Sequence, residues 1–342
     1  MTNACRGKRL VLRFASSRGG ALLAVLWLSA ALSAVAFSVA TTIRGEVERS
    51  STATDGVKSY FLARGAIERA LLWMVWSELY RNPDGSYRYW VPGARRLNFD
   101  FPAGQVEVQL IPELGKLNVN TIRPGELFAL LLALGAPAER AREITAAILD
   151  WRTPSPQGLT EFDQYYLLRT PTFLARHASI EEIEEVLNVR GMTLELFHGS
   201  WDRDREGNLF AKAGLKDCLS VYASGEQVDV NSAQPETLLA MGLPPDAVAT
   251  LVQARRLAPF QSVEQLRSFS AQLGPVSGRL TVGMGTILTV RATARLRLAS
   301  GQLSDLKRTV AALVKLAPVT RDAPYHVIRW YDQPGLLRGD LQ

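Results

Sequence analysis

The sequence predicts an α+β fold, in which one long N-terminal helix packs on an antiparallel sheet and a large all-α region is inserted in the chain. Three observations predict it. Apolar residues recur at helical spacing from Gly20 to near Tyr80. Apolar and polar residues alternate with a period of two on both sides of the inserted region, as in half-buried strands. Residues 112–280 between them have the pattern of short helices and contain an internal repeat.

The N-terminal helix begins with a segment long and apolar enough to cross a membrane. Residues Gly20–Ile43 carry no charge, and a helix of this length spans roughly 36 Å, against a bilayer core of about 30 Å. The preceding residues contain no acid and five cations: Arg6, Lys8, Arg9, Arg13 and Arg18. By the positive-inside rule, we expect the N-terminal tail in the cytoplasm and the rest of the chain outside it.

Three kinds of segment share these features. A secretory signal peptide would be cleaved after Ala34-Val35-Ala36 or Ser38-Val39-Ala40, but its apolar region is normally about 7 to 15 residues long. A plain membrane anchor explains the length but gives no reason for the pair Gly19-Gly20. The third is a basic leader, a glycine at the charge boundary and an apolar helix directly after it. This arrangement resembles the signal of type IV pilin-like proteins, which a prepilin peptidase cleaves on the cytoplasmic side. The resemblance implies a leader of residues 1–19 and a retained transmembrane helix over residues 20–43.

One residue departs from the usual pilin pattern. Cleavage after Gly19 would make Gly20 the N-terminus and place Ala24 at the fifth mature position, whereas cleavage after Gly20, which the sequence leaves open, would place Val25 there. Most pilins and pseudopilins carry a Glu at this position, thought to neutralise the terminal ammonium of an adjoining subunit in the bilayer. Within the family, absence of this acid is associated with the K-type minor pseudopilin of type II secretion systems and suits a subunit at the filament tip.

Motifs farther along the chain resemble those of the same K-type family, in the same order. They are GKLNVNT from Gly115, AAILDWRT from Ala146, EFDQYY from Glu161, SIEEIEEVLNVRGM from Ser179 and VNSAQPETLLAM from Val230. The resemblance implies a single-pass protein of the bacterial inner membrane with a periplasmic C-terminal domain, which initiates or caps a pseudopilus for the export of folded proteins across the outer membrane. It implies as partners the I- and J-type pseudopilins, the prepilin peptidase, the inner-membrane assembly platform and, further, secreted protein substrates.

A pilin-like head accounts for both ends of the remaining chain. We assign residues 44–111 and 281–342 to it. The amphipathic part of the long helix should end near Tyr80, because Asn82-Pro83-Asp84-Gly85 is turn chemistry. Period-two alternation predicts short strands between Tyr87 and Ile111, and a hairpin built from residues 289–298 and 309–314.

The inserted region contains two copies of one helical unit. Residues 112–227 form the first helical subdomain and residues 228–280 the second, because LNVNT from Leu117 matches VDVNS from Val228. We align Ala178 with Gln261 near the end of each copy, so the first copy carries a loop insertion at about residues 153–177. Asn120 and Asn231 are predicted to cap the helices that follow them, together with their neighbours Thr121 and Ser232.

Each copy has the helix–turn–helix pattern of helix-hairpin-helix or SAM-like units, which raises the alternative of a membrane-anchored DNA-binding protein of a DNA-uptake system. Such units bind phosphate through free backbone N–H groups in the hairpin. Here Pro137 and Pro244 remove N–H groups from the hairpins, and an acid follows each turn. The net charge of +6 includes the five leader cations, so the mature chain is nearly neutral. Nucleic acid is therefore an unfavoured partner.

Three acids border the proline-rich loop of the first copy: Asp150, Glu161 and Asp163. Hard oxygen ligands on a loop suit calcium, and K-type relatives carry calcium sites in this helical domain, so a structural calcium is one hypothesis and solvated or capping acids the other. Relatives can also carry a disulfide between positions near Lys116 and Cys218. This chain has a Lys at the first position, and Cys5 would leave with the leader.

An enzyme is not predicted. The histidines are His177, His198 and His326, and their spacing matches no metalloprotease motif; no nucleophile elbow or phosphate-binding loop occurs either. We expect these histidines to be surface or packing residues.

Overall fold

The computed structural model describes residues 18–203, 206–224, 226–269, 273–317 and 323–332. Residues 1–58 and residues 59–342 form two compact units. Helix α1 (Arg18–Leu79) has residues in both, and it ends one residue before the predicted Tyr80. In the first unit its apolar side chains are exposed, among them Leu22, Trp27 and Phe37. This part of α1 is long and apolar enough to cross a membrane.

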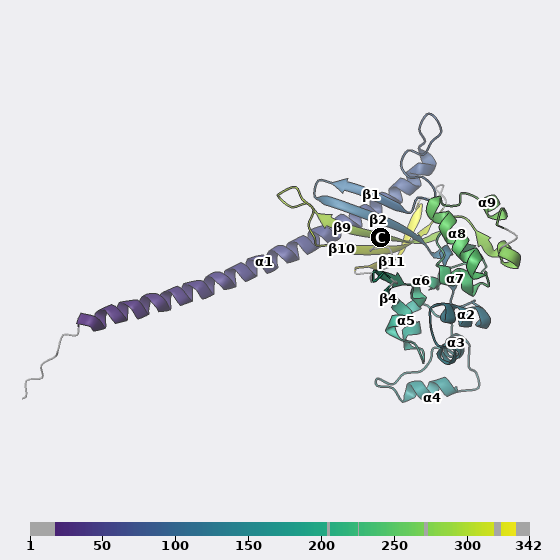
Figure 1. Cartoon of the computed structure of the whole chain (residues 1–342), viewed down its shortest axis with the longest axis horizontal. Helices are drawn as coiled ribbons and strands as arrows, with labels where there is room; N and C mark the ends of the chain where they lie inside the picture. Colours follow the sequence, from purple (N-terminus) through teal and green to yellow (C-terminus); the bar gives the residue numbers. More distant parts are fainter. Residues whose placement is uncertain (1–17, 204–205, 225, 270–272, 318–322, 333–342) are drawn as a thin grey trace, which may run out of the picture. The chain divides into compact units, whose positions relative to one another are not determined.

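The second unit contains a five-stranded antiparallel sheet of order β1-β2-β9-β10-β11. The strands are β1 (Arg96–Phe101), β2 (Gly104–Pro112), β9 (Ile287–Leu296), β10 (Arg308–Leu316) and β11 (Tyr325–Tyr331), and they lie side by side in Figure 1. Residues 63–74 of α1 pack on one face, where they share a core with Val106, Val108, Val290 and Val310. The predicted α+β class, with a long helix across an antiparallel sheet, is confirmed.

Two parts of the head differ from the sequence prediction. Residues 87–91 form no strand, although Tyr87 makes an isolated bridge with Arg81. The Tyr89 ring instead packs against Trp73 and Trp76 of α1, which explains the apolar alternation. Strand β11 was not predicted. Its register against β10 shifts between Leu313 and Val314, and this bulge interrupts the period of two.

The inserted region lies between β2 and β9 in the chain. Its first part contains the 3-10 turn η1 (Glu113–Gly115), β3 (Leu117–Asn118), α2 (Pro124–Ala133), α3 (Ala138–Arg152), α4 (Glu161–Leu167), η2 (Ile183–Asn188), α5 (Leu194–His198), β4 (Ser200–Arg203), β5 (Leu209–Lys212), α6 (Leu215–Cys218) and β6 (Leu219–Ser220). Its second part contains β7 (Val228–Asp229), α7 (Pro235–Ala240), α8 (Pro245–Leu257), α9 (Val263–Arg267), η3 (Gly274–Arg279) and β8 (Leu280–Thr281). Both parts share one hydrophobic core, separate from that of the head. Helix α4 lies at the end of this region remote from the sheet (Figure 1).

The two copies close in the same way. A short parallel pairing joins the ends of each, β3 with β6 and β7 with β8. At the end of α3, Arg152 donates to the carbonyls of Val119 and Ile122. At the corresponding place in α8, Arg255 donates to those of Val230 and Ala233. Helix α2 of the first copy packs against α7 of the second.

The predicted capping role of Asn120 and Asn231 is wrong. Helices α2 and α7 begin with a proline at N1. Their N-cap residues are Arg123 and Gln234, not the asparagines, and neither N-cap residue makes a capping hydrogen bond through its side chain. Asn120 instead accepts from the N–H of Ile180 at 2.8 Å and donates to its carbonyl at 2.9 Å. Each asparagine therefore clamps the chain where it returns after the second helix of its copy.

The clamps also correct the alignment of the copies. Asn231 makes the same two bonds with Phe260, at 2.9 and 2.8 Å, so Ile180 corresponds to Phe260. The next residues agree, because the N–H of Glu181 bonds Glu185 and that of Gln261 bonds Gln265. The predicted pairing of Ala178 with Gln261 is therefore wrong by three residues.

Candidate functional site

The apolar part of α1 is the first candidate site. Gly20 and Ala24 lie on its exposed surface. The predicted cleavage site after Gly19 falls in the first turn of the helix, which begins at Arg18, and residues 1–17 of the predicted leader lie outside the described residues. An exposed helix without charge can bury its surface only in lipid or against other apolar helices.

The second candidate site surrounds Asp163, which is 1% exposed. Its Oδ2 accepts from the N–H of Thr160 at 2.9 Å and lies 2.8 Å from Nε2 of His177. Its Oδ1 accepts from the N–H of Ala175 at 3.1 Å. Asp163 and Thr160 form a capping box at the start of α4. One buried carboxylate thus joins Thr160, at the start of α4, to Ala175 and His177, near the end of the inserted loop.

His177 faces hydrogen-bond acceptors on both sides of its ring. Nδ1 lies 3.1 Å from the carbonyl oxygen of Asp150 and Nε2 faces Asp163. Burial lowers the pKa of His177, but the bonds to Asp163 and to the Asp150 carbonyl outweigh it and raise this pKa above its ordinary value. Burial raises the pKa of Asp163, yet the donors from Thr160, His177 and Ala175 bring it below its usual range. An imidazolium donating from both nitrogens fits this arrangement.

These contacts decide how well the three predicted calcium ligands fit a cation. The Oδ2 atom of Asp150 accepts from Thr160 Oγ1 at 3.2 Å, and Asp163 is surrounded by N–H donors. Glu161 is exposed at the start of α4. Within the described ranges, no group of three His, Cys, Asp or Glu side chains is placed to hold a metal. Oδ2 of Asp150 and both oxygens of Asp163 already accept hydrogen bonds, so this arrangement of the side chains offers calcium few open ligands from these two acids.

The hairpins of the two copies offer little to a phosphate. The N–H groups of Gly135 and Ala136 bond the carbonyls of Leu132 and Leu131, and those of Gly242 and Leu243 bond Leu239 and Leu238. Gly135 and Gly242 have φ of 91° and 98°, as helix C-terminal caps require. Because these donors are used within the helix ends, the geometry disfavours the DNA-binding alternative.

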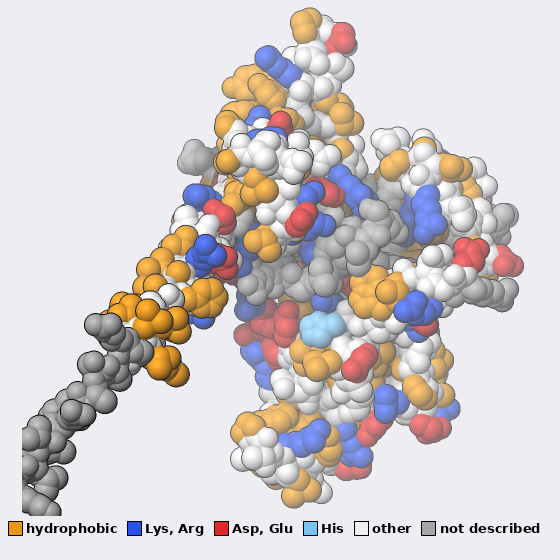
Figure 2. All heavy atoms as spheres, turned by 60° about the vertical axis from the view of Figure 1, so that its left-hand side comes forward, with side chains coloured by type: hydrophobic (Ala, Val, Ile, Leu, Met, Phe, Trp, Pro, Cys, Tyr) orange, Lys and Arg blue, Asp and Glu red, His pale blue; other side chains and the backbone are white. Residues whose placement is uncertain are grey.

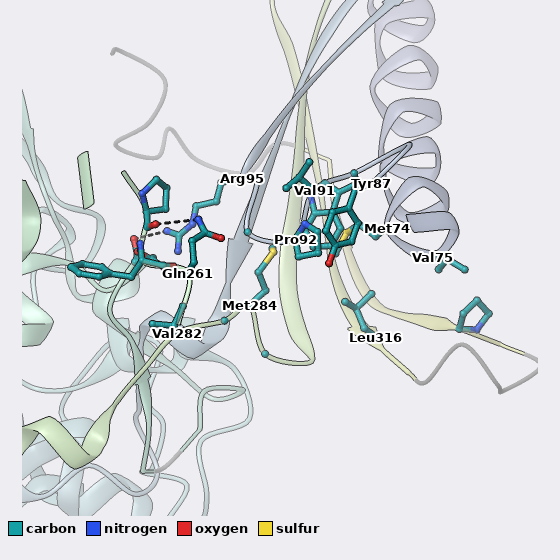
Figure 3. Close-up of a pocket in the computed structure, with 18 of the residues that line it drawn as sticks. Met74, Val75, Tyr87, Val91, Pro92, Arg95, Gln261, Val282, Met284 and Leu316 are labelled. Carbon is teal, nitrogen blue, oxygen red and sulfur yellow. Dashed lines mark hydrogen bonds between the residues drawn. The ribbon is translucent and has the colours of Figure 1, made fainter. Parts of the chain in front are cut away.

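A cleft of about 520 Å³ lies between the head and the second helical subdomain. Figure 3 shows Tyr87, Val91 and Pro92 on one side of it and Gln261 on the other. Among the described residues that line it, none is Asp, Glu, His, Cys, Lys or Ser. The polar side chains that line it include Tyr87, Arg95 and Gln261.

The pair of positions at Lys116 and Cys218 is brought together. Leu117 and Leu219 are partners in the parallel β3–β6 pairing, so the residues before them are neighbours across it. Cys218 is buried, and burial raises the pKa of its thiol. Nζ of Lys116 lies 3.2 Å from Oε2 of Glu113.

Comparison with known proteins identifies a family whose members resemble this chain. Residues 115–199, which include α2, α3 and the loop around Asp163, match the family model of Type II secretion system (T2SS), protein K. The chain is 25% identical over 275 residues to the Type II secretion system protein K of Klebsiella pneumoniae, covering 75% of this chain and 78% of that protein. It is 24% identical over 198 residues to the protein of the same name from Pseudomonas aeruginosa, covering 57% and 54%.

The chain belongs to the type II secretion protein K family. It is thus a K-type minor pseudopilin, and the apolar part of α1 is long and apolar enough to anchor it in a membrane. The fold agrees. A chain in the crystal structure of the GspK-GspI-GspJ complex from the type 2 secretion system of enterotoxigenic Escherichia coli superposes with a TM-score of 0.56 at 16% identity, covering 83% of this chain and 99% of that chain.

Sequence reasoning missed two residues of the sites. His177 was expected to be a surface or packing residue, but it forms the ion pair with Asp163. The two residues are fourteen positions apart, with the end of α4 and an irregular segment between them, and no local pattern signals that contact. Arg95 was also missed. It donates to Asp229 and to the carbonyl of Asn231 at 2.9 and 2.6 Å and holds the second helical subdomain to the head.

Proposed function

We propose that this K-type minor pseudopilin occupies the tip of a type II secretion pseudopilus, where it initiates or caps assembly for the export of folded proteins. The observation that carries the proposal is the exposed, uncharged helix that follows Gly19-Gly20 and has Ala24 where the family's acid is expected. A subunit that must accept another above it needs a partner for that subunit's terminal ammonium, since an unpaired charge in the bilayer is costly. Ala24 supplies none.

The inserted helical region supports the same position. It lies beside the sheet, held by the Arg95–Asp229 ion pair and by the bond from Thr289 to Glu113 at 3.0 Å. A region of this size adds bulk that a repeating filament subunit would have to accommodate at every step. At a filament end, only one such region has to be accommodated.

The proposal includes location and partners. The basic N-terminal tail supports a leader in the cytoplasm and a C-terminal domain in the periplasm of a bacterium, across the inner membrane. The relative of similar fold was solved in a complex with GspI and GspJ, and we extend this to I- and J-type partners of the present chain. The prepilin peptidase and the inner-membrane assembly platform act on it before and during assembly, and secreted proteins are the cargo.

The decisive experiment is mass spectrometry of the mature N-terminus, with and without a co-expressed prepilin peptidase. We expect peptidase-dependent loss of residues 1–19 and a new terminus at Gly20. Replacing Gly19 should block this processing, whereas replacing Gly45, farther along the same helix, should not. A terminus near Phe37 or Thr41 would indicate a secreted protein and contradict the proposal. An intact Met1 would indicate a plain anchor.

The position in the filament needs a separate test. Co-expression with I- and J-type pseudopilins should give a complex containing one copy of this chain, measured by native mass spectrometry. The variant Ala24→Glu should allow further subunits to add above it and give longer assemblies. Incorporation of many copies of the unaltered chain along a filament would contradict a tip position, even if N-terminal processing occurs as expected.

A further inference from the structure

The first copy carries an arm that the second copy lacks. In the second copy, only residues 256–259 separate Arg255 from the clamped Phe260, whereas residues 153–179 separate Arg152 from the clamped Ile180. We call residues 153–179 the arm. Because the second copy makes the same clamp without an arm, closing the fold does not require one.

The arm turns leucines outward. Leu168 is 86% exposed, and Leu159, Leu167 and Leu174 are 61%, 42% and 49% exposed. Figure 2 shows apolar side chains gathered at the lower end of the molecule, where α4 lies in Figure 1. Four exposed leucines within one short segment lose the hydrophobic stabilisation that burial would give, so they indicate a surface that contacts something else.

Hydrogen bonds and aromatic contacts order the arm that carries these leucines. Asp163 joins Thr160 to Ala175 and His177 within it, as described above. The ring of the buried Tyr166 stacks on Phe173 with centroids 5.1 Å apart and contacts Trp151 edge-on at 5.5 Å. The leucines therefore project from an ordered support.

An aromatic and a cationic residue flank Leu167 and Leu168 in the chain, namely Tyr165 and Arg169. The ring of Tyr165 has the guanidinium of Arg169 at 4.8 Å and that of Arg190 at 5.0 Å. Arg169 follows Leu168 in the chain and is exposed. Exposed leucines beside a tyrosine and an exposed arginine suit a membrane surface, where apolar side chains meet acyl chains and cations meet phosphates. A protein partner is less favoured, because protein interfaces are centred on Trp, Tyr and Arg, and Leu is under-represented among their hot spots.

We propose that the arm is a second membrane contact of this chain, in which Leu167 and Leu168 insert into the surface of a bilayer and Arg169 meets anionic lipid headgroups. This contact is separate from the transmembrane helix and goes beyond the pseudopilus role. It places the helical region against lipid.

The experiment uses the full chain reconstituted in vesicles of phosphatidylethanolamine and phosphatidylglycerol, in a Cys5→Ser background. An environment-sensitive fluorophore is attached at Gln164→Cys, an exposed position four residues before Leu168 in α4. The matched control is Gln253→Cys, an exposed position four residues before Leu257, which is 89% exposed in α8. Cys218 is buried and should not react. Brominated acyl chains should quench the label at Gln164→Cys and leave that at Gln253→Cys unquenched.

Substitutions then show which side chains make the contact with the bilayer. Leu167→Ser with Leu168→Ser should lower the ratio of docked to free arm at least tenfold, whereas Leu257→Ser should leave it unchanged. Arg169→Ala should lower it about fivefold on vesicles that contain phosphatidylglycerol and have little effect on purely zwitterionic ones. The proposal is overturned if the label at Gln164→Cys is no more quenched than that at Gln253→Cys. It is also overturned if quenching survives the double leucine substitution, which would show that lipid is met elsewhere.

Discussion

Arg95 of the head and Asp229 of the second helical subdomain form an ion pair, with Nη2 and Oδ2 2.9 Å apart and the carboxylate fully buried. Asp229 also accepts from the N–H of Ser232 at 2.9 Å and from that of Gly283 at 3.1 Å. The carboxylate thus joins three segments of chain. Burial lowers the pKa of Arg95, and the charge of Asp229 opposes this shift.

We expect Arg95→Met to destabilise the chain by about 3 kcal/mol, because it leaves the buried Asp229 without its cation. The neighbouring Arg96 gives the matched control. Its Nε lies 3.8 Å from Oε1 of Glu107, and both side chains are about half exposed, so Arg96→Met should cost under about 0.5 kcal/mol. Urea unfolding of the detergent-solubilised chain measures both. Equal losses would show that the Arg95 ion pair does not hold the subdomain to the head.

The His177–Asp163 pair predicts how stability depends on pH. The pKa of His177 is raised on folding, so its contribution is complete below the unfolded imidazole pKa of about 6.5 and is lost as pH rises through the folded value. The pKa of Asp163 is lowered, so its contribution is complete above about 3.8 and is lost as pH falls through the folded value. The pair should therefore stabilise the fold most between about pH 4 and 6.5.

The variant His177→Asn tests this pH dependence. His177 has φ of 47°, a left-handed conformation that Asn tolerates better than most residues. Unfolding free energies should fall less between pH 6 and 8.5 in the variant than in the unaltered chain. The control is His326→Asn, on the exposed side of β11. An identical decline in both variants would mean that another group carries the pH dependence.

Calcium provides a separate test of the same cluster. Since the oxygens of Asp163 already accept hydrogen bonds from Thr160, Ala175 and His177, we expect added calcium or chelator to leave the unfolding midpoint unchanged. A bound ion would raise the stability by roughly 2.7 kcal/mol at a concentration 100 times its Kd. Such a rise, abolished by Asp163→Asn, would show that Asp150, Glu161 and Asp163 rearrange into a calcium site.

The positions of Lys116 and Cys218 predict a disulfide. Neighbouring strands lie about 4.8 Å apart, within the Cα separations of about 4.4 to 6.8 Å that disulfides span. In a Cys5→Ser background, Lys116→Cys should therefore form a bridge with Cys218 on oxidation, shown by thiol titration and faster migration without reductant. Closing a loop of about 100 residues should stabilise the chain by about 4 to 5 kcal/mol. Lys212→Cys, in the β4–β5 hairpin, should stay reduced under the same conditions, and a bridge there would mean that the pairing is not specific.

Local patterns explain what the sequence could predict. Helix α1 and strands β9 and β10 have regular periods, and the turn after α1 has its own residue chemistry. The sequence did not predict strand β11, because its bulge lets three residues pack on the head core at irregular spacing: Tyr325, Val327 and Trp330. A strict period of two would have placed Arg329 on that side. The bulge arises from pairing with β10, which no local pattern reveals.

The sites depended more on long-range contacts. Gly19, Gly20 and Ala24 could be named from the sequence, because their meaning lies in their order along the chain. The surroundings of Asp163 could not, since its donors come from Thr160, Ala175 and His177 on both sides of an irregular loop. The acids could be recognised in the sequence, but the hydrogen-bond donors that contact them could not.

The clamps made by Asn120 and Asn231 give the last prediction. Each side chain donates to and accepts from the backbone of one distant residue, 60 and 29 positions away. Replacing either by Ala leaves the backbone N–H and C=O of the buried Ile180 or Phe260 without partners, and each unmet group costs about 1 to 3 kcal/mol. We therefore expect Asn120→Ala and Asn231→Ala each to lower the free energy of unfolding by about 2 to 4 kcal/mol, measured by urea denaturation.

The variant Asn120→Asp should lose the bond to the Ile180 carbonyl and keep the bond from the Ile180 N–H, so its loss of stability should be intermediate. The exposed Asn188 serves as control, and its replacement by Ala should change stability by less than about 0.5 kcal/mol. If only one clamp variant is destabilised, the two copies close by different contacts despite their equal geometry.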